Sequence, residues 1–377
     1  MSHSTSDLTA THAAMMQRCL TLARRATGQT APNPLVGSVV VSQGQIVGEG
    51  FHPQAGQPHA EVFALRAAGA AARGATLYVN LEPCNHTGRT PPCTEAILAA
   101  GIQTVVIGMS DPNPTASGGI ERLRAAGLTV ITAVEAAACR RLNEAFIHRV
   151  RYRQPFGILK YAMTLDGKIA AASGHSAWVS GPAARQRVHQ LRGSCDAVIV
   201  GGNTVRRDNP NLTTHGVMIA PDQPARNPLR VVMSRRLDLP TQANLWQTQT
   251  APTLVFTTEA TADLAIWQQL EQQGVEVVGL PALTPAAVMQ QLYERGLLSV
   301  LWECGGTLAA QAIAQGAVQK LWAFIAPKLI GGSQAPTPVG DLGLARMTDA
   351  IALSHLQLEP VGPDWLIQGY LQAHPDA

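Results

Sequence analysis

The pattern of apolar and polar residues changes its period several times in the first part of the chain. Residues 13–25 and 59–72 place apolar side chains at helical spacing, whereas 36–47 is typical of two strands separated by a Gln-Gly turn. Further strands are expected at 76–81, 104–108 and 129–134, and further helices at 93–100 and 119–126. This alternation of strands and helices predicts a three-layer α/β domain.

A basic stretch that ends in proline, residues 148–155, interrupts this alternation. The alternation then resumes, with apolar strands expected at 156–163, 197–201, 229–233, 253–256, 275–278, 299–303 and 321–325. Because 377 residues exceed what one hydrophobic core usually organises, we expect two α/β domains, residues 1–150 and 151–377.

The composition narrows the choice of partners and compartment. Charged residues make up only 14% of the chain, so its surface carries few charges. A sparsely charged surface predicts contacts between subunits. The net charge is +3, and no block of lysine and arginine is typical of a nucleic-acid surface. No apolar run approaches the roughly 20 residues of a membrane span, and residues 1–12 do not resemble a signal peptide. We therefore expect a cytoplasmic protein with six reduced cysteines and with neither a nucleic-acid nor a membrane partner.

Three metal-binding side chains occur within a short segment. His59 is followed by Cys84, which comes directly after a proline, and by Cys93. One imidazole and two thiolates are typical zinc ligands, and three protein ligands leave the fourth tetrahedral position for water. Such an open site is typical of a catalytic zinc, and it predicts hydrolytic deamination of an amino-substituted heterocycle.

Glu61 is expected to carry protons and not to bind the metal. Two positions along a helix turn a side chain by about 200°, which separates Glu61 from His59. Zinc deaminases combine a His-x-Glu motif, whose glutamate is the general acid and base, with a later Pro-Cys-x-x-Cys motif. Here eight residues separate Cys84 from Cys93, so the segment between them must loop outwards. Two ordinary cysteines and a surface histidine are the alternative interpretation, but the combination of motifs is uncommon.

The lengthened motif Cys-Asn-His-Thr-Gly-Arg-Thr-Pro-Pro-Cys at 84–93 resembles the deaminase half of the bifunctional deaminase–reductase family of riboflavin biosynthesis. The resemblance extends to residues 31–37 and 111–114, and so spans most of residues 10–150. It implies a cytidine-deaminase-like domain that acts on 2,5-diamino-6-ribosylamino-4(3H)-pyrimidinone 5′-phosphate. It also implies that Asn33, His86 and Asp111 bind this substrate.

Segments of the second half, 160–170, 198–205, 208–213 and 301–308, resemble the dihydrofolate-reductase-like reductase domain of the same family. No Gly-x-Gly-x-x-Gly motif follows a strand, so we do not expect a Rossmann domain. The resemblance implies NADPH as the cofactor and reduction of the ribosyl group to ribityl. It places cofactor contacts at Ala162, Trp178, Thr204, Asp208, Ser234, Gly305, Gly306, Thr307 and Leu308, and substrate contacts at Ser176, Arg192, Leu212, His215 and Glu303.

One position departs from the family pattern. His215 stands where the resemblance implies an arginine, and a neutral imidazole is a weaker phosphate partner than a guanidinium group. Four other arginines could compensate for the missing guanidinium group at the substrate phosphate, or could bind the 2′-phosphate of the cofactor. They are Arg206, Arg207, Arg235 and Arg236. Solvated surface charge is the alternative interpretation of each.

Three other functions stay open at this point. A nucleic-acid editing deaminase would need a basic face with stacking aromatic side chains, but aromatic residues make up only 5% of the chain. An inactive zinc-stabilised scaffold would not need Glu61. In the third alternative, the second half serves only for dimerisation.

The family resemblance implies a homodimer or a larger homo-oligomer.

Overall fold

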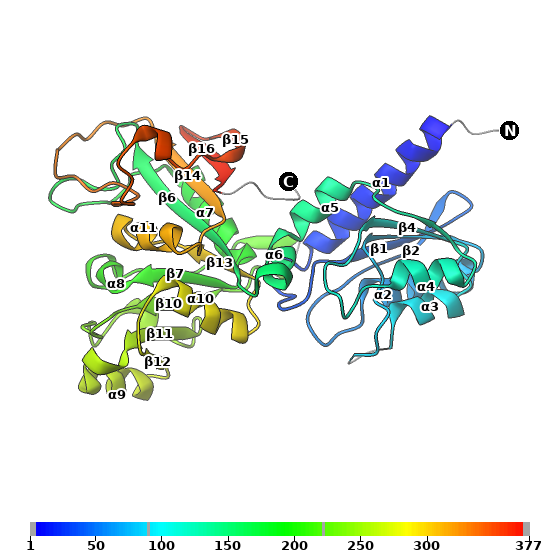
Figure 1. Ribbon diagram of the computed structural model, residues 1–377, viewed down its shortest axis with the longest axis horizontal. Coiled ribbons are helices and arrows are strands. Elements are labelled where there is room, and N and C mark those ends of the chain that lie inside the picture. Colours follow the sequence, from blue (N-terminus) through cyan, green and yellow to red (C-terminus); the bar gives the residue numbers. More distant parts are fainter. Residues whose placement is uncertain (1–4, 89–90, 221–222, 372–377) are drawn as a thin grey trace. The chain divides into compact units, whose positions relative to one another are not determined.

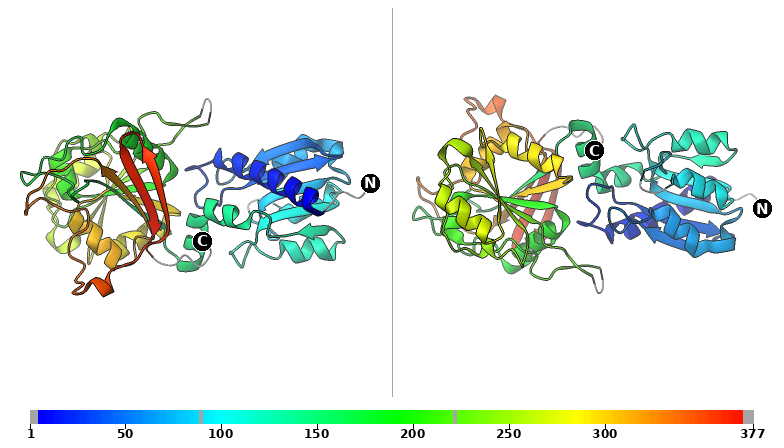
Figure 2. Two further views of the ribbon diagram at one scale, coloured as in Figure 1. Left: turned by 90° about the horizontal axis from the view of Figure 1, so that it is seen from above. Right: turned by 90° about the horizontal axis from the view of Figure 1, so that it is seen from below.

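The computed structural model describes residues 5–88, 91–220 and 223–371. The chain divides into two compact units, Met1–Tyr152 and Arg153–Pro375 (Figures 1 and 2). Among the helices of the described residues, none combines the length and the apolar character that crossing a membrane requires.

The first unit contains α1 (Thr5–Arg24), β1 (Gly37–Ser42), β2 (Gln45–Phe51), α2 (Ala60–Ala68), a 3₁₀ turn (Gly69–Ala72), β3 (Thr76–Leu81), α3 (Cys93–Ala99), β4 (Thr104–Met109), α4 (Gly119–Ala125), β5 (Thr129–Ile131), α5 (Ala136–Leu142) and α6 (Glu144–Tyr152). The strands form one sheet in the order β2-β1-β3-β4-β5. β1 pairs antiparallel with β2 and β3, whereas β3, β4 and β5 run parallel. Helices α2, α3 and α4 cover one face, and α1 and α5 cover the other (Figure 1). The predicted three-layer α/β domain is confirmed.

Two helices of this unit, α5 and α6, are not predicted by the sequence pattern. Residues 148–152, interpreted as a break between domains, instead form the end of α6. Phe146, Ile147 and His148 of this helix are buried, and their burial holds the helix although half of its other residues are charged. Strand β5 is shorter than expected and ends at Ile131.

Glycines in β2 allow α2 to lie directly on the sheet. A Cβ atom at Gly48 would collide with the carbonyl oxygen of Ala64, and one at Gly50 with that of Ala60. Because both positions are glycine, the helix approaches the strand closely and its inner alanines are buried. This contact fixes the position of the first turn of α2, which His59 precedes.

The second unit contains β6 (Phe156–Thr164), α7 (Pro182–Ser194), β7 (Ala197–Gly201), α8 (Gly202–Asp208), β8 (Met218–Ala220), β9 (Gln223–Pro224), β10 (Leu229–Met233), β11 (Thr253–Thr258), α9 (Leu264–Gln272), β12 (Glu276–Leu280), α10 (Pro285–Glu294), β13 (Ser299–Trp302), α11 (Gly306–Ala314), β14 (Lys320–Ala326), β15 (Ser354–Val361) and β16 (Asp364–Tyr370), with three 3₁₀ turns (Asn244–Trp246, Glu259–Thr261 and Met347–Asp349). All seven predicted strands are present. Nine strands form one sheet in the order β12-β11-β10-β7-β13-β6-β14-β16-β15.

The sheet of the second unit is parallel from β12 to β14, and β16 and β15 continue it antiparallel. Helices α10 and α11 pack in the main core, and α7 packs with β14 and β16 in a separate cluster. Four neighbouring strands run parallel, namely β10, β7, β13 and β6. Their carboxyl ends therefore lie along one edge of the sheet. In open α/β sheets this edge is where ligands usually bind.

Candidate active sites

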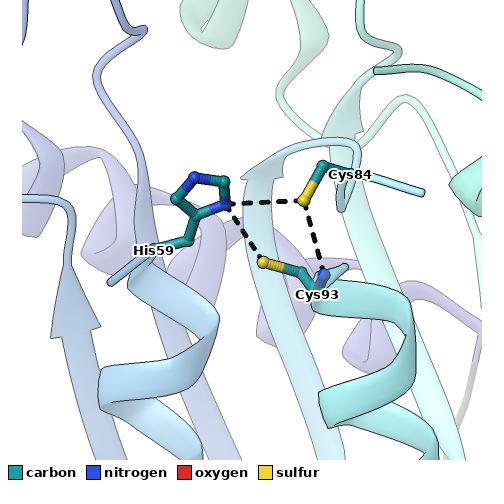
Figure 3. Close-up of side chains that lie close together, drawn as sticks. All are labelled: His59, Cys84 and Cys93. Atoms are coloured by element: carbon teal, nitrogen blue, oxygen red, sulfur yellow. Dashed lines mark hydrogen bonds between the residues drawn. The ribbon is translucent and has the colours of Figure 1, made fainter. Parts of the chain in front are cut away.

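His59, Cys84 and Cys93 come together in the first unit (Figure 3). His59 Nδ1 lies 3.2 Å from Cys93 Sγ and 3.5 Å from Cys84 Sγ, and all three ligand atoms lie within 4.8 Å of one another. A tetrahedral zinc with bonds of about 2.0–2.3 Å holds its ligand atoms roughly 3.5–3.8 Å apart, so these side chains fit this metal. Within the described ranges this is the one such group of potential ligands.

The loop before α3 and the first residue of that helix position the two cysteines. Cys84 comes three residues after β3, and Cys93 begins α3. The backbone N–H of Cys93 donates to Cys84 Sγ at 3.4 Å. The pKa of Cys84 falls to about 4, because the thiol of Cys93 donates to it and His59 lies beside it, although burial opposes the shift. A thiolate is the form of cysteine that binds zinc.

Glu61 lies in the first turn of α2 and is only 3% exposed. Its Oε2 atom has no hydrogen-bond partner among the described residues. Burial raises the pKa of this carboxyl group, because the charged form loses its hydration. An unpartnered carboxylate oxygen beside a metal site is suited to accept a proton and return it.

A cavity of about 510 Å³ opens at these side chains, and His59, Glu61 and Cys84 line it. Its volume is typical of a small-molecule site. Asn33 and the exposed His86, both expected to bind substrate, also line the cavity. The motif residues Arg89 and Thr90 lie outside the described residues.

Sequence reasoning misses His52, a further residue of this cavity. Its Nδ1 lies 3.0 Å from the carbonyl oxygen of Pro58, and its Nε2 lies 3.0 Å from Asn33 Nδ2. The ring therefore donates to Pro58 and accepts from Asn33, which leaves the amide oxygen of Asn33 for a ligand. Burial lowers the pKa of His52, in keeping with a neutral ring. A single histidine without a neighbouring motif gives no signal in the sequence.

Asp111, the third expected substrate contact, is not among the residues that line the cavity. Its backbone N–H donates to Glu82, and its carboxylate accepts the N–H of Asn113 at 2.8 Å. Burial raises the pKa of Asp111 to about 6. Asn113 lines the cavity in its place, so substrate contact by Asp111 stays a prediction.

In the second unit, Arg192 and Glu303 form a largely buried, bidentate ion pair, in which Arg192 Nη2 lies 3.0 Å from Glu303 Oε2. Lys160 Nζ lies 3.8 Å from the same oxygen. Although burial opposes ionisation, Arg192 and Lys160 lower the pKa of Glu303 to about 2. Sequence reasoning assigns no role to Lys160, although this residue begins one of the motifs that carry the family resemblance.

His215 lies beside a second histidine that sequence reasoning misses. The ring centroids of His215 and His189 are 4.3 Å apart, and His189 Nδ1 lies 3.3 Å from Arg192 Nη1. Arg192 also donates to the carbonyl oxygen of Thr213. Leu212 is buried, with a φ of +54° in the left-handed region. The histidine that replaces the expected arginine is thus part of a cluster with His189 and Arg192.

Eight of the nine expected cofactor contacts lie in or after β6, β7, β10 and β13, which are neighbours in the second sheet. They comprise Ala162 in β6, Thr204 and Asp208 in α8, Ser234 directly after β10, and Gly305, Gly306, Thr307 and Leu308 at the start of α11. A Cβ atom at Gly305 would meet no other atom within 4 Å, so open space lies before the N-terminus of α11. Backbone N–H groups at a helix start can bind phosphate, but cofactor contact at these glycines stays a prediction.

Ser176 and Trp178 lie in the exposed segment before α7. The guanidinium group of Arg185 stacks 4.4 Å from the centre of the Trp178 ring, and Lys328 Nζ donates to the Trp178 carbonyl oxygen at 2.6 Å. Within the described residues, these contacts do not connect either side chain to the cluster around Arg192. Their roles in binding stay predictions.

Both units of the chain resemble known proteins. Residues 9–109 match the cytidine and deoxycytidylate deaminase zinc-binding region, and residues 155–367 match the RibD C-terminal domain. The chain is 62% identical to riboflavin biosynthesis protein RibD of Synechocystis over 362 residues, 96% of each chain, and 39% identical to RibD of Escherichia coli over 93% and 96%. It also matches a solved deaminase/reductase from Thermotoga maritima with a TM-score of 0.85, at 35% identity, over 96% of this chain and 99% of that one.

The fold and the zinc-binding group define a bifunctional enzyme, with a cytidine-deaminase-like domain and a reductase domain. The chain belongs to the RibD family of riboflavin biosynthesis. The expected family, fold class, pair of activities and cofactors, zinc and NADPH, are confirmed. Family membership decides against the editing deaminase, the inactive scaffold and the pure dimerisation module.

Proposed function

We propose that the first unit hydrolyses an amino group from 2,5-diamino-6-ribosylamino-4(3H)-pyrimidinone 5′-phosphate, and that the second unit reduces the ribosyl group of the product to ribityl. Residues 1–150 would carry the first activity and residues 151–377 the second. The observation that carries the proposal is the buried, unpartnered carboxylate oxygen of Glu61 on the cavity that two of the zinc-binding residues line. The names of the solved relative, a diaminohydroxyphosphoribosylaminopyrimidine deaminase and a 5-amino-6-(5-phosphoribosylamino)uracil reductase, support the substrates.

In the deaminase site, His59, Cys84 and Cys93 would hold zinc, which when bound lowers the pKa of water towards neutrality and so supplies a nucleophile. Glu61 accepts one proton from the attacking water and passes it to the ring nitrogen. It then accepts the second proton from the newly attached hydroxyl group and passes it to the amine, which leaves as ammonia as the C–N bond breaks and the C–O bond becomes a carbonyl. Because burial raises its pKa, Glu61 binds and releases a proton nearer to neutral pH than an exposed glutamate does.

Asn33, His86 and Asp111 would orient the ring. The amide oxygen of Asn33 is available to an amino group of the substrate, because His52 accepts from the amide nitrogen. His86 lines the cavity from the loop between the two cysteines.

In the reductase site, NADPH when bound would supply a hydride to C1′ of the ring-opened imine, and a proton from solvent at the imine nitrogen completes the ribitylamine. Arg192, with Ser176, Leu212 and His215, would bind the substrate and its phosphate. Glu303 stays ionised and holds Arg192 in place, because the neighbouring cations Arg192 and Lys160 lower its pKa. The cofactor would lie along the carboxyl edge of the sheet, against Gly305 and the start of α11.

We further propose that the enzyme acts in the cytoplasm, as a homodimer or larger homo-oligomer, without nucleic-acid or membrane partners. All six cysteines are free, which suits a reducing compartment. Leu356, Leu358 and Trp365 of the β15–β16 hairpin are each more than half exposed, which supports a contact between copies at this edge of the sheet.

Replacing Glu61 tests the deaminase half. Glu61→Gln keeps the shape of the side chain but removes its basic oxygen, so we expect kcat for ammonia release to fall about 10²- to 10⁴-fold. Zinc content and reduction of the deaminated product should not change. Glu95→Gln, at an exposed glutamate of α3, is the matched control and should have wild-type activity. Ammonia release by Glu61→Gln at the wild-type rate would remove Glu61 from the reaction.

A further inference from the structure

The deaminase cavity reaches from the zinc-binding residues to helix α6. Phe146, Arg149 and Val150 line it there, at positions i, i+3 and i+4, so one face of the helix forms this part of the wall. Asn33 and Glu61 line the same cavity. A volume of about 510 Å³ leaves room for a ribosyl phosphate as well as for a pyrimidine ring.

The charges around this cavity single out one residue. Its titratable side chains, among the described residues, are His52, His59, Glu61, Glu82, Cys84, His86 and Arg149. Arg149 is the one among them that carries a positive charge at every physiological pH. Glu82 accepts the backbone N–H groups of Asp111, Gly118 and Ile120, so its carboxylate is engaged in holding the surrounding loop.

We propose that Arg149 binds the 5′-phosphate of the ribotide in the deaminase site and makes this activity selective for the phosphorylated substrate. The proposal rests on the proposed function of this site. A guanidinium group forms parallel, charge-assisted hydrogen bonds to two phosphate oxygens. Ile147 belongs to the hydrophobic core of the first unit, so α6 is anchored and holds the base of the Arg149 side chain at the cavity.

A purely structural role for Arg149 is the competing explanation, since cations near the C-terminus of a helix stabilise it. Arg151 allows the two roles to be separated. It lies in the same last turn of α6, is exposed and is not among the residues that line the cavity. Loss of the Arg151 charge should therefore affect the stability of the helix in a similar way but should not affect substrate binding.

The test measures ammonia release from the ribotide and from the dephosphorylated riboside. The zinc-loaded full-length enzymes are the wild type, Arg149→Met, Arg149→Lys and Arg151→Met. We expect Arg149→Met to lower kcat/KM for the ribotide about 10- to 100-fold, mainly through KM, as loss of a charged hydrogen bond predicts. For the riboside the change should stay within about threefold, Arg149→Lys should recover part of the loss, and Arg151→Met should match the wild type. Ribose 5-phosphate should inhibit the wild type more strongly than Arg149→Met.

An equal loss on both substrates, with equal inhibition by ribose 5-phosphate, would overturn the proposal in favour of a structural role. A wild-type enzyme without preference for the ribotide would also overturn it. If the wild type releases no ammonia from either substrate, the proposed function itself fails, and the role of Arg149 fails with it. Zinc content and melting temperature, measured on every variant, identify any protein that is misfolded.

Discussion

The carboxylates of Glu61 and Glu303 are both buried, yet their surroundings favour opposite protonation behaviour. Around Glu61 burial prevails and raises the pKa, so this group is suited to carry a proton. Around Glu303 the cations Arg192 and Lys160 outweigh burial and lower the pKa to about 2. Glu303 therefore stays charged and serves as an anchor, which fits a reductase that positions its substrate beside the nicotinamide.

His189 gives the second unit a stability that depends on pH. Burial, Arg192 and His215 lower the pKa of His189 from its ordinary 6.5 to about 4. The neutral ring therefore contributes stability that is fully present above pH 6.5 and is lost as the pH falls towards 4. Because the ring is partly exposed, we expect this loss to be about 1 kcal/mol, or ~2–4 °C in melting temperature.

Melting curves of the wild type and His189→Gln between pH 7.5 and 4.5 (roughly the titration range of histidine) measure this contribution. The variant should lose less stability than the wild type as the pH falls. His355→Gln, at an exposed histidine of the same unit, should follow the wild type. Parallel curves for wild type and His189→Gln would show that His189 is not the group responsible.

Single residues could be predicted from the sequence only where a motif surrounds them. His59, Glu61, Cys84 and Cys93 have the residue types and spacing of a zinc deaminase, and the structure brings the three metal ligands together. His52, Arg149 and His189 reach the sites from segments without such a motif, and only the folded chain shows where they lie.

At the scale of elements, the zinc site depends on how α4 is held against the loop after β3. Gly118 and Ile120, at the start of α4, donate their backbone N–H groups to Glu82. A Cβ atom at Gly119 would collide with the carbonyl oxygen of Pro83, the residue before Cys84. The N-terminus of α4 thus packs tightly against the segment that presents a zinc ligand.

Gly119→Ala should therefore weaken zinc binding. The added methyl group must push α4 away from Pro83, at a cost of about 1–3 kcal/mol in stability, and displace Cys84. We expect zinc content after dialysis to fall several-fold, together with the melting temperature. Gly305→Ala is the control, because a Cβ atom there meets no other atom within 4 Å. Full zinc occupancy and unchanged melting of Gly119→Ala would contradict this description of the site.

Elements were predictable where apolar residues repeat with a clear period and not elsewhere. β3 and β10 have the predicted bounds, because each is a short apolar run that ends at a turn. Helix α6 combines a few buried residues with several charged ones, and its basic end is also what a linker would show. Most residues of β15 are exposed, so the strand lacks the alternation that marks a half-buried strand.

At the scale of the whole molecule, each site is built from residues of one unit. Among the described residues, those that line the cavity at Glu61 all belong to the first unit, and the cluster around Arg192 lies within the second. Each unit also has its own hydrophobic core. We therefore expect the deaminated intermediate to leave the first site and reach the second by diffusion.

The two activities are tested most directly by the mass of the product that the purified, zinc-loaded protein forms from the diaminopyrimidinone ribotide. With NADPH present, we predict a product in which one amino group has been replaced by oxygen and two hydrogens have been added. Without NADPH the product should show only the first change, and after zinc removal the ribotide should remain. Addition of the two hydrogens without loss of the amino group, or no change with both cofactors present, would contradict the assignment of the two activities.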